Sequence, residues 1–267
     1  MDTPSRLTPR QVNLRSIALP AEHGSWGFWL EAVLLGLLLA PTFNGVLFSL
    51  AALALMLLHQ PLKIALKDVI KKRQSPRRAA AVQFAALYGL VGGVLLLIVL
   101  IQSPALLLVP LALAGALIGV QIIYDLRGRS RHMVAELCGS VALGSIAAAV
   151  AIIGSRALPF ALGLWLALAL RTITSVVYAR SKLRLERGKP HTPITAGWWH
   201  LAAGLTAAVL AWADALPWTV LIGVILLSVR TLHGLYRPEG IKPKVVGIRE
   251  MVIGVGYALL VALGYTI

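Results

Sequence analysis

The sequence predicts an all-α membrane protein that crosses the bilayer about nine times. Its composition, its apolar runs and the placement of its charges each point to this class. Hydrophobic residues make up 58% of the 267-residue chain and charged residues only 13%, with a mean hydropathy of +0.83. A soluble domain carries about 25% charged residues. Because the chain has too few polar groups to cover a water-facing surface, lipid must cover much of it.

Nine apolar runs come close to the roughly 20 residues that a membrane helix needs. They span residues 25–41, 44–62, 79–101, 104–123, 134–153, 157–178, 196–213, 216–233 and 246–266. No polar stretch is long enough to build a second domain. We therefore expect a single transmembrane domain over residues 21–267, preceded by a polar tail over residues 1–20.

The charges of the loops predict the orientation in the membrane. The connections from odd to even spans are tight, and Arg156 is their only basic residue. The connections from even to odd spans are longer and carry Lys63, Lys67, Lys71, Lys72, Arg73, Arg77, Arg78, Arg127, Arg129, Arg131, Arg180, Lys182, Arg184, Arg187, Lys189, Arg237, Lys242, Lys244 and Arg249. The positive-inside rule then places the N-terminus and all the basic loops in the cytoplasm.

Other functional classes are excluded by the same features. The net charge of +15 invites a nucleic-acid interpretation, but the cations lie in short loops and no basic nucleic-acid motif occurs, so no nucleic-acid partner is expected. Cys138 is the only cysteine, which rules out a disulfide within the chain and a CxxC site. The polar segment Met1–Pro20 has no apolar core beside a cleavage site, so we interpret it as a mature cytoplasmic tail.

Two of the basic loops share a spacing. Lys63 and Lys67 follow the second span, Arg180 and Arg184 follow the sixth, and each pair stands at i and i+4. Like charges at that spacing on a helix repel by a few tenths of a kcal/mol, which an anion bound between them would relieve. Positive-inside selection and attraction to anionic lipid heads also explain basic loops without a site, but they do not explain the shared spacing.

The run Ala21–Glu31, AEHGSWGFWLE, resembles the signature of the YwiC-like family of bacterial membrane proteins, whose function is poorly defined. The similarity extends over most of the chain and implies a location in the bacterial inner membrane. The wider layout, nine helices with polar motifs after helices two and six, resembles the UbiA superfamily of intramembrane prenyltransferases. That resemblance implies a UbiA-like helical bundle.

In the UbiA superfamily the two motifs, NDxxDxxxD and DxxxDxxxGxxT, hold magnesium, which in turn holds a prenyl diphosphate. Laid on this chain, they fall on His59, Gln60, Lys63 and Lys67, and on Arg180, Arg184, Gly188 and His191-Thr192. Magnesium prefers oxygen ligands, which these cations cannot supply. The departure implies no metal site and no magnesium cofactor. It implies a metal-free anion clamp, since arginine grips phosphate through paired hydrogen bonds and lysine adds a point charge.

Ionisable residues inside or beside the spans form a second set of candidates, because charge at membrane depth is costly. This set is Glu22, Glu31, Glu136, Arg171, Arg230 and Glu250. Pairing of Glu31, Glu136 or Glu250 with Arg171 or Arg230 would satisfy both signs. A structural ion pair that joins helices is the simpler interpretation of each.

Three further residues are candidates for a catalytic role. His23, at the start of the first span, is a possible proton carrier or phosphate contact, or else an ordinary interfacial residue. Tyr124, with Arg127, resembles the tyrosine-plus-basic segment that reaches the diphosphate in the UbiA superfamily. Tyr178 lies at the mouth of the sixth span and is a candidate for the same role as Tyr124.

The expected function is therefore binding of a prenyl or lipid (di)phosphate through a cationic cytoplasmic pocket, with membrane lipids as the other partners. Its enzymatic form would be a metal-independent prenyl transfer, in which cations stabilise the charge of the departing diphosphate. Two alternatives stay open at this point. One is a transporter or flippase for an anionic metabolite or lipid, and the other is a non-catalytic lipid-binding protein.

Overall fold

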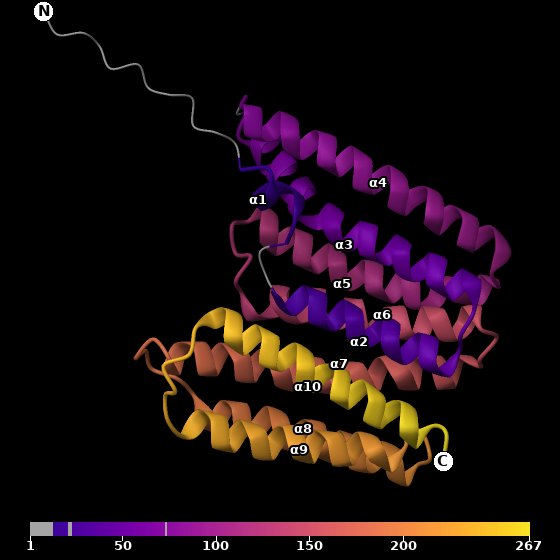
Figure 1. Cartoon of the computed structure of the whole chain (residues 1–267), viewed down its shortest axis with the longest axis vertical. Helices are drawn as coiled ribbons and strands as arrows, with labels where there is room; N and C mark the ends of the chain where they lie inside the picture. Colours follow the sequence, from indigo (N-terminus) through magenta and orange to yellow (C-terminus); the bar gives the residue numbers. More distant parts are fainter. Residues whose placement is uncertain (1–12, 21–22, 73) are drawn as a thin grey trace, which may run out of the picture.

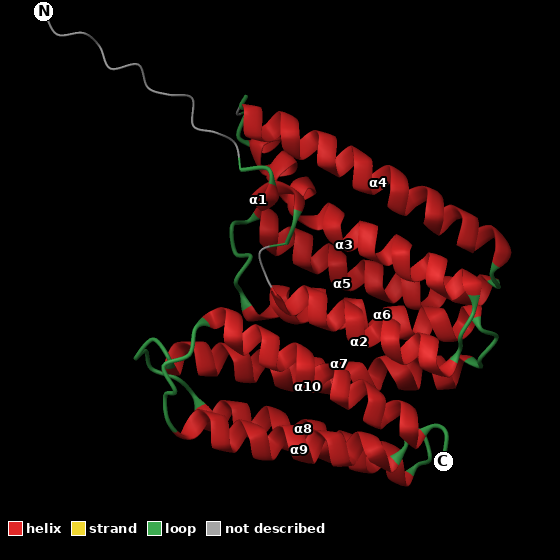
Figure 2. Ribbon diagram, viewed as in Figure 1, coloured by secondary structure: helices red, strands yellow, loops and turns green. Residues whose placement is uncertain are grey.

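The computed structural model describes residues 13–20, 23–72 and 74–267, and these residues form helices and no strands. The elements are α1 (Arg15–Ala18), α2 (His23–Leu39), α3 (Phe43–Ile70), α4 (Pro76–Gln102), η1 (Ala105–Leu107), α5 (Leu108–Leu126), α6 (Met133–Ile153), α7 (Leu158–Leu185), α8 (Pro193–Trp212), α9 (Trp218–Tyr236) and α10 (Pro243–Gly264). Among the described residues, eight helices are long and apolar enough to cross a membrane, and α2 adds a shorter apolar helix. The predicted class, an all-α polytopic membrane protein, is confirmed (Figure 2).

The helices begin where the sequence supplies capping residues. The Thr42 side chain accepts a hydrogen bond from the Gly45 amide at 3.0 Å and begins α3. Ser75 does the same for α4, with Pro76 in the first helical position. Both features are favoured at helix N-termini. The side-chain oxygen accepts a hydrogen bond from a backbone amide that has no partner within the helix, and proline has no amide hydrogen that needs a partner.

Two helices run well past the predicted spans. Helices α3 and α7 each contain 28 residues, which corresponds to about 42 Å. The hydrocarbon core of a bilayer is about 30 Å thick. Both pairs of i and i+4 cations therefore stand on continuous helix, as their spacing requires.

The bundle is arranged in three groups (Figure 1). Helices α3, α4 and α5 lie on one side, α2, α6 and α7 lie in the middle, and α8, α9 and α10 lie on the other side. Helix α6 packs against α2, α5 and α7, and α10 packs against α2. The middle group therefore lies between the two outer groups, and one hydrophobic core extends through all three, from Phe48 of α3 to Val220 of α9.

Small side chains form the centre of the bundle. The stretch Ala147–Ile152 of α6 is almost fully buried. A Cβ added to Gly36 would lie 2.9 Å from the Val150 side chain, so glycine lets α2 approach α6 closely. Such small-residue contacts are the usual basis of helix packing in membranes, where van der Waals contact replaces the hydrophobic drive.

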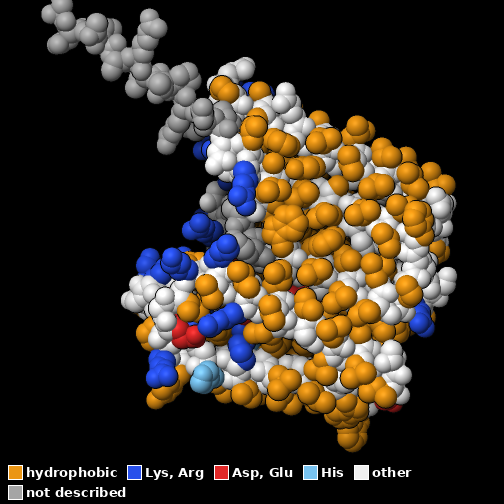
Figure 3. Space-filling model, viewed as in Figure 1, with side chains coloured by type: hydrophobic (Ala, Val, Ile, Leu, Met, Phe, Trp, Pro, Cys, Tyr) orange, Lys and Arg blue, Asp and Glu red, His pale blue; other side chains and the backbone are white. Residues whose placement is uncertain are grey.

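The surface divides into an apolar girdle and a basic end. Figure 3 shows hydrophobic side chains over the helix flanks and Lys and Arg gathered at the end where α3, α5, α7 and α9 finish. Helix α1 lies at this end, where Ile17 is buried against Ile64, Ala65 and Ala81. Part of the segment that we expected to be a polar tail thus packs on α3 and α4.

Candidate functional site

A cavity of about 580 Å³ lies between α3, α4, α5 and α6. On α3 the lining residues recur every three or four positions between Phe48 and Lys67. They are Phe48, Ala51, Ala52, Leu55, Met56, His59, Gln60, Lys63, Ile64 and Lys67. On α5 the wall consists of Leu111, Ala114, Ile118, Gln121 and Asp125. Both spacings select a single face of a helix. The cavity is therefore built from one face of each helix, and its long axis follows α3.

The polarity of the wall changes along the cavity. The end nearest the basic loops is lined by His59, Lys63, Lys67, Arg77, Asp125, Ser130, Arg131 and Glu136. The opposite end is lined by Phe48, Leu96, Leu111, Leu143 and Ile146. A molecule that fills this cavity would place a polar group at the basic mouth and an apolar group inside the membrane region.

Asp125 is the acid at the centre of the polar end. Asp125 as a whole is only 3% exposed. Its carboxylate lies 2.8 Å from Nε2 of His59 and 2.9 Å from Nζ of Lys63. Hydrogen bonds to an ionised group are shorter and stronger than neutral ones. Asp125 therefore compensates the charge of Lys63 and fixes the His59 ring. Within the described residues, no three His, Cys, Asp or Glu side chains come together as metal ligands.

Three other cations at the mouth have no ion-pair partner among residues 13–20, 23–72 and 74–267. They are Lys67, Arg77 and Arg131. Lys67 is partly buried, one helical turn beyond Lys63, whereas Arg77 and Arg131 are exposed. A concave surface lined by charge of one sign concentrates ions of the other sign. The described part of the mouth therefore attracts anions.

The structure brings together only part of the predicted anion clamp. His59, Lys63 and Lys67 line the cavity, and Arg180 lies beside it, bonded to the Glu136 carboxylate. Arg184 is exposed and donates through Nε to the Pro190 carbonyl at 2.7 Å, outside the lining. Arg127, at the C-terminal end of α5, is also exposed and does not line the cavity.

The reason for this separation lies in the direction of the α7 side chains. Lys182, between the two arginines, is fully buried and donates to the Gly234 carbonyl at 2.7 Å. It also pairs with Glu186 and Glu239, at 3.0 and 2.7 Å. The buried face at this end of α7 is thus turned toward α9 and the loop after it, and not toward the α3 cavity.

The three catalytic candidates lie apart from the cavity lining. The Tyr124 ring is 4.9 Å from the His132 ring, and the Tyr178 ring lies 3.8 Å below the Arg230 guanidinium. His23 begins α2, but its side chain lies outside the described part of the chain, as does Glu22.

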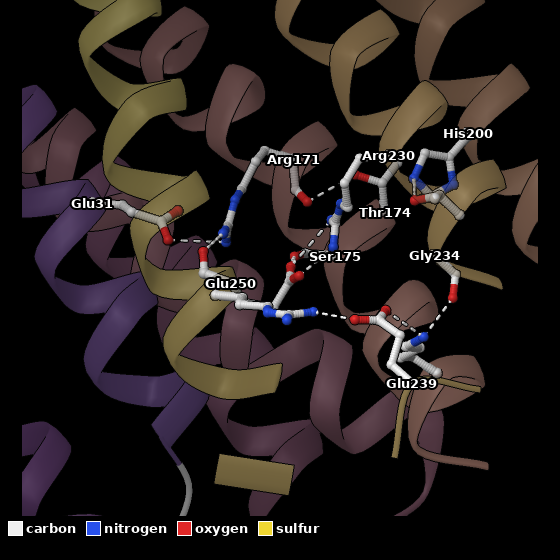
Figure 4. A network of polar contacts seen from close by, with 12 residues as sticks. Glu31, Arg171, Thr174, Ser175, His200, Arg230, Gly234, Glu239 and Glu250 are labelled. Atoms are coloured by element: carbon white, nitrogen blue, oxygen red, sulfur yellow. Dashed lines mark hydrogen bonds and ion pairs between the residues drawn. The ribbon is translucent and has the colours of Figure 1, made fainter. Parts of the chain in front are cut away.

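A second polar cluster, shown in Figure 4, joins α2, α7, α9 and α10. The Arg171 Nη1 atom lies 3.0 Å from Glu31 Oε1, and both residues are 1% exposed. Arg230 pairs with Glu250, whose carboxylate also accepts a hydrogen bond from Ser175. The structure thus contains two of the pairings that the sequence suggested, while Glu136 pairs with Arg180 instead.

The Glu31–Arg171 pair is close in distance but poorly aligned. Among the described residues, neither carboxylate oxygen of Glu31 has a hydrogen-bond partner, although Arg171 Nη2 donates to the Glu250 carbonyl at 2.6 Å. A Cβ on Gly254 would occupy the space of the Glu31 carboxylate. Glycine at this position of α10 therefore makes room for the pair.

The cluster continues to the basic end of the bundle. His200 contacts the Ala196 carbonyl and the Thr231 hydroxyl, at 2.8 and 2.9 Å. Closer to the loops, Glu239 pairs with Lys182 and Arg249. Hydrogen bonds from Arg249 and Lys182 lower the pKa of Glu239 from 4.5 to about 2. The ion pairs of this cluster therefore extend from Glu31–Arg171 in the membrane interior to Glu239–Arg249 near its surface.

The sequence did not identify three of the residues that shape the site. Asp125 follows Gln121 and Ile118 on one helical face, and an acid that ends such a face is a usable signal. In the sequence, Arg77 and Arg131 were recognisable only as two of the many cations in the basic loops. Nothing local distinguishes them from the other loop cations, because their role depends on how α4 and the α5–α6 loop surround the cavity.

Comparison with known proteins supports one of the two resemblances. The model of the YwiC-like protein family matches residues 19–151, which include helices α2 to α5 and most of α6. A search of the curated proteins finds no match. The matched segment contains the signature run and all the residues that line the cavity, from Pro20 to Ile146. The YwiC-like resemblance expected from the sequence is therefore supported over residues 19–151.

Proposed function

We propose that this protein binds the (di)phosphate head of an isoprenoid or other lipid at the cationic mouth of the α3–α6 cavity, with the apolar tail inside. The observation that carries this proposal is the placement of Lys67, Arg77 and Arg131 at the polar end of a cavity whose other end is apolar. A phosphate monoester carries about −1.5 to −2 charges at pH 7. The three cations without a described partner supply the opposite charge, and the arginines supply paired donors.

Lys63 and His59 have a different part in this proposal. Asp125 already compensates Lys63, so this lysine adds little net charge. It instead holds the carboxylate that orients His59. Because Nε2 donates to Asp125, the other ring nitrogen, Nδ1, is an acceptor in the neutral ring and donates to a phosphate only in the imidazolium form. We place the head between Lys67, Arg77 and Arg131, with His59 and Lys63 beneath it.

The orientation of the protein belongs to the same proposal. Positive-inside selection favours the cytoplasm for the basic end, and thus for the cavity mouth. The YwiC-like family match favours a bacterial inner membrane. The ligand would then enter from the cytoplasmic leaflet.

Prenyl transfer would be the enzymatic extension of this binding. The UbiA resemblance supports it, and cations at the head would stabilise the diphosphate as it leaves the allylic carbon. Fold resemblance alone is a weak guide to activity, so binding is the primary claim. Release of pyrophosphate from farnesyl diphosphate in the presence of an acceptor would identify the enzyme. Movement of the lipid between leaflets of a vesicle would identify a transporter.

The test is equilibrium binding of farnesyl diphosphate to the purified full-length protein. Hydrogen bonds to charged groups contribute about 1.5–3 kcal/mol each, so the Lys67→Gln/Arg77→Gln variant should bind at least about tenfold more weakly. Arg187→Gln removes an exposed cation of the α7 end and is the matched control. Arg184→Gln, a member of the clamp inferred from the sequence, should also bind normally. Equal binding by the double variant, or an equal loss in Arg184→Gln, would contradict the proposed site.

Metal removal gives an independent check. With no carboxylate cluster assigned to hold magnesium, the proposed contacts are direct ones between cations and phosphate. Chelation with EDTA should therefore leave the affinity for farnesyl diphosphate unchanged. Binding that strictly requires magnesium would contradict the metal-free arrangement.

A further inference from the structure

We infer that His59 acts as a general base at the cavity mouth, where it takes a proton from a water molecule that attacks a phosphorus atom of the bound head. The reaction is hydrolysis of a lipid diphosphate to a lipid monophosphate and inorganic phosphate. This inference rests on the proposed function and names a reaction for the same site. It follows from the ion pair of Asp125, the hydrogen bonding of the His59 ring and the position of His59 on α3.

The Asp125 carboxylate fixes which ring nitrogen of His59 carries the hydrogen. It forms an ion pair with Nζ of Lys63 at 2.9 Å, which is the interaction of an ionised acid. An ionised carboxylate only accepts hydrogen bonds, so Nε2 of His59, at 2.8 Å, must donate to it. In the neutral ring the lone pair then belongs to Nδ1.

The Nδ1 atom of His59 is not occupied by the protein. Within residues 13–20, 23–72 and 74–267, the only hydrogen bond of the ring is the one at Nε2. His59 lines the cavity, and its side chain is 32% exposed, whereas that of Asp125 is 5% exposed. A nitrogen with a lone pair repels phosphate oxygens but accepts a proton from water, as a general base must. The ring is thus arranged for proton transfer and not for holding the anion.

His59 lies on the same face of α3 as the lysine assigned to the head. His59, Lys63 and Lys67 follow one another at intervals of four residues and all line the cavity, so they share one helical face. A side chain on a helix leans toward the N-terminus of that helix, and Lys67 therefore leans toward His59. A head held by Lys67 lies on the His59 side of this lysine, with the water between Nδ1 and the phosphate.

The proposed step balances in atoms and electrons. The water oxygen forms a bond to phosphorus, and the bond between that phosphorus and the bridging oxygen breaks, with its electron pair leaving on the departing phosphate. One water proton passes to Nδ1 of His59. Asp125, which faces Nε2, stabilises the imidazolium until it releases the proton to solvent. Lys67, Arg77 and Arg131 offset the charge on the phosphate oxygens.

The leaving group selects the class of substrate. Cleavage of a diphosphate releases a phosphate or a phosphate monoester, which is a stable anion at pH 7 because its second pKa is about 6. Cleavage of a monophosphate must instead release an alkoxide, which requires a proton that a general base does not supply. Farnesyl diphosphate should therefore be hydrolysed at least about tenfold faster than farnesyl monophosphate.

The experiment measures phosphate release from farnesyl diphosphate by the purified full-length protein in water enriched in oxygen-18. Wild-type protein should place the label in farnesyl monophosphate or in inorganic phosphate. His59→Gln keeps an amide donor for Asp125 but removes the base, so its kcat should fall at least about a hundredfold. Its affinity for farnesyl methylenediphosphonate, whose bridging carbon resists hydrolysis, should stay unchanged. His233→Gln changes an exposed histidine in the last turn of α9 and is the matched control, with wild-type kcat.

Asp125 is a positioning residue in this mechanism, and Asp125→Asn tests it separately. The neutral amide no longer stabilises the imidazolium, so kcat should fall at least about tenfold. Lys63 loses its counter-charge at the same time, so the methylenediphosphonate should bind at least as tightly as it does to wild type. A merely structural role of Asp125 would weaken both. If thermal unfolding shows that His59→Gln is not folded, this variant carries the test.

The outcomes separate this inference from the proposed function. If wild-type protein does not bind farnesyl methylenediphosphonate, both are overturned. If it binds the analogue but does not hydrolyse farnesyl diphosphate, or if His59→Gln hydrolyses it as wild type does, only this inference is overturned. Oxygen-18 in farnesol would show that the carbon–oxygen bond is cleaved, and it would also overturn the inference. So would loss of analogue binding by folded His59→Gln.

Discussion

The cavity mouth and the polar cluster inside the bundle differ in how their charges are compensated. Around the α3–α6 cavity, Lys67, Arg77 and Arg131 have no ion-pair partner in the described part of the chain. In the cluster of α2, α7, α9 and α10, Arg171 and Arg230 each pair with a glutamate. The mouth is thus prepared for an anion that is not part of the chain. In the second cluster, Glu31 and Glu250 supply the anions.

This difference separates stability from binding. A buried pair that loses one partner leaves an uncompensated charge in a medium of low dielectric constant, which is strongly destabilising. A cation at a solvated mouth can be removed with little effect on folding. We therefore expect substitutions in the paired cluster to change stability and substitutions at the mouth to change binding.

The largest expected effect concerns Arg171. Arg171→Met leaves the Glu31 carboxylate buried without its partner, and such a loss costs about 3–5 kcal/mol. Glu31→Leu/Arg171→Met removes both charges and should restore most of the stability. The measurement is unfolding of the detergent-solubilised variants. A single variant as stable as wild type would show that the pair is not a structural link.

Gly254 on α10 tests the same pair without changing a charge. Gly254→Ala places a methyl group where the Glu31 carboxylate lies, and overpacking of this kind costs about 1–3 kcal/mol. Gly256→Ala, on the same helix with open space around it, is the matched control. Its alanine should leave stability unchanged or raise it by up to about 1 kcal/mol. Equal unfolding temperatures for the two variants would contradict the tight fit.

At the mouth, the expected stability change is smaller and has the opposite sign. Lys67→Gln removes repulsion from Lys63 at i−4, which should stabilise the ligand-free protein by about 0.2–0.5 kcal/mol. Wild-type protein at a hundredfold excess of farnesyl diphosphate over its dissociation constant should gain about 2.7 kcal/mol. The variant, which loses a charged hydrogen bond, should lose at least about half of that gain. Thermal unfolding with and without the ligand measures both quantities, and a variant destabilised without ligand would count against the comparison.

The smallest effect is a pH dependence at the surface of the paired cluster. The pKa of Glu239 is lowered from 4.5 to about 2. Its contribution to stability is therefore complete above about pH 4.5 and is lost as the pH falls toward about 2. Unfolding temperatures of wild type and Glu239→Gln should differ most at neutral pH and converge on acidification. A difference in unfolding temperature that grows toward low pH would show that ionised Glu239 does not stabilise the fold.

The helices were predictable, since their signals are local. Runs such as 79–101 and 134–153 lie within α4 and α6, and Thr42 and Ser75 mark helix starts through their own side chains. The predicted span ended at residue 62, whereas α3 continues to Ile70. The i and i+4 spacing of Lys63 and Lys67 had a meaning only if the helix continued past the span. Helix α1 was missed, because four residues give no periodic pattern and its burial depends on contact with α3 and α4.

The site was less predictable, because helix rotation decides which cations face one another. Lys63 and Lys67 share the cavity face of α3, whereas the equal spacing of Arg180 and Arg184 on α7 leaves them outside the lining. The burial of Lys182 between them sets that rotation. Spacing along one helix identified both pairs but gave no information on the direction in which either faces.

The most direct test of the proposed site is an experimental structure of the protein with bound farnesyl diphosphate. We predict that the diphosphate lies within hydrogen-bond distance of Lys67 Nζ and of the Arg77 or Arg131 guanidinium, with the apolar tail extending toward Phe48. A diphosphate bound between Arg180 and Arg184, with the α3–α6 cavity filled by other molecules, would contradict it.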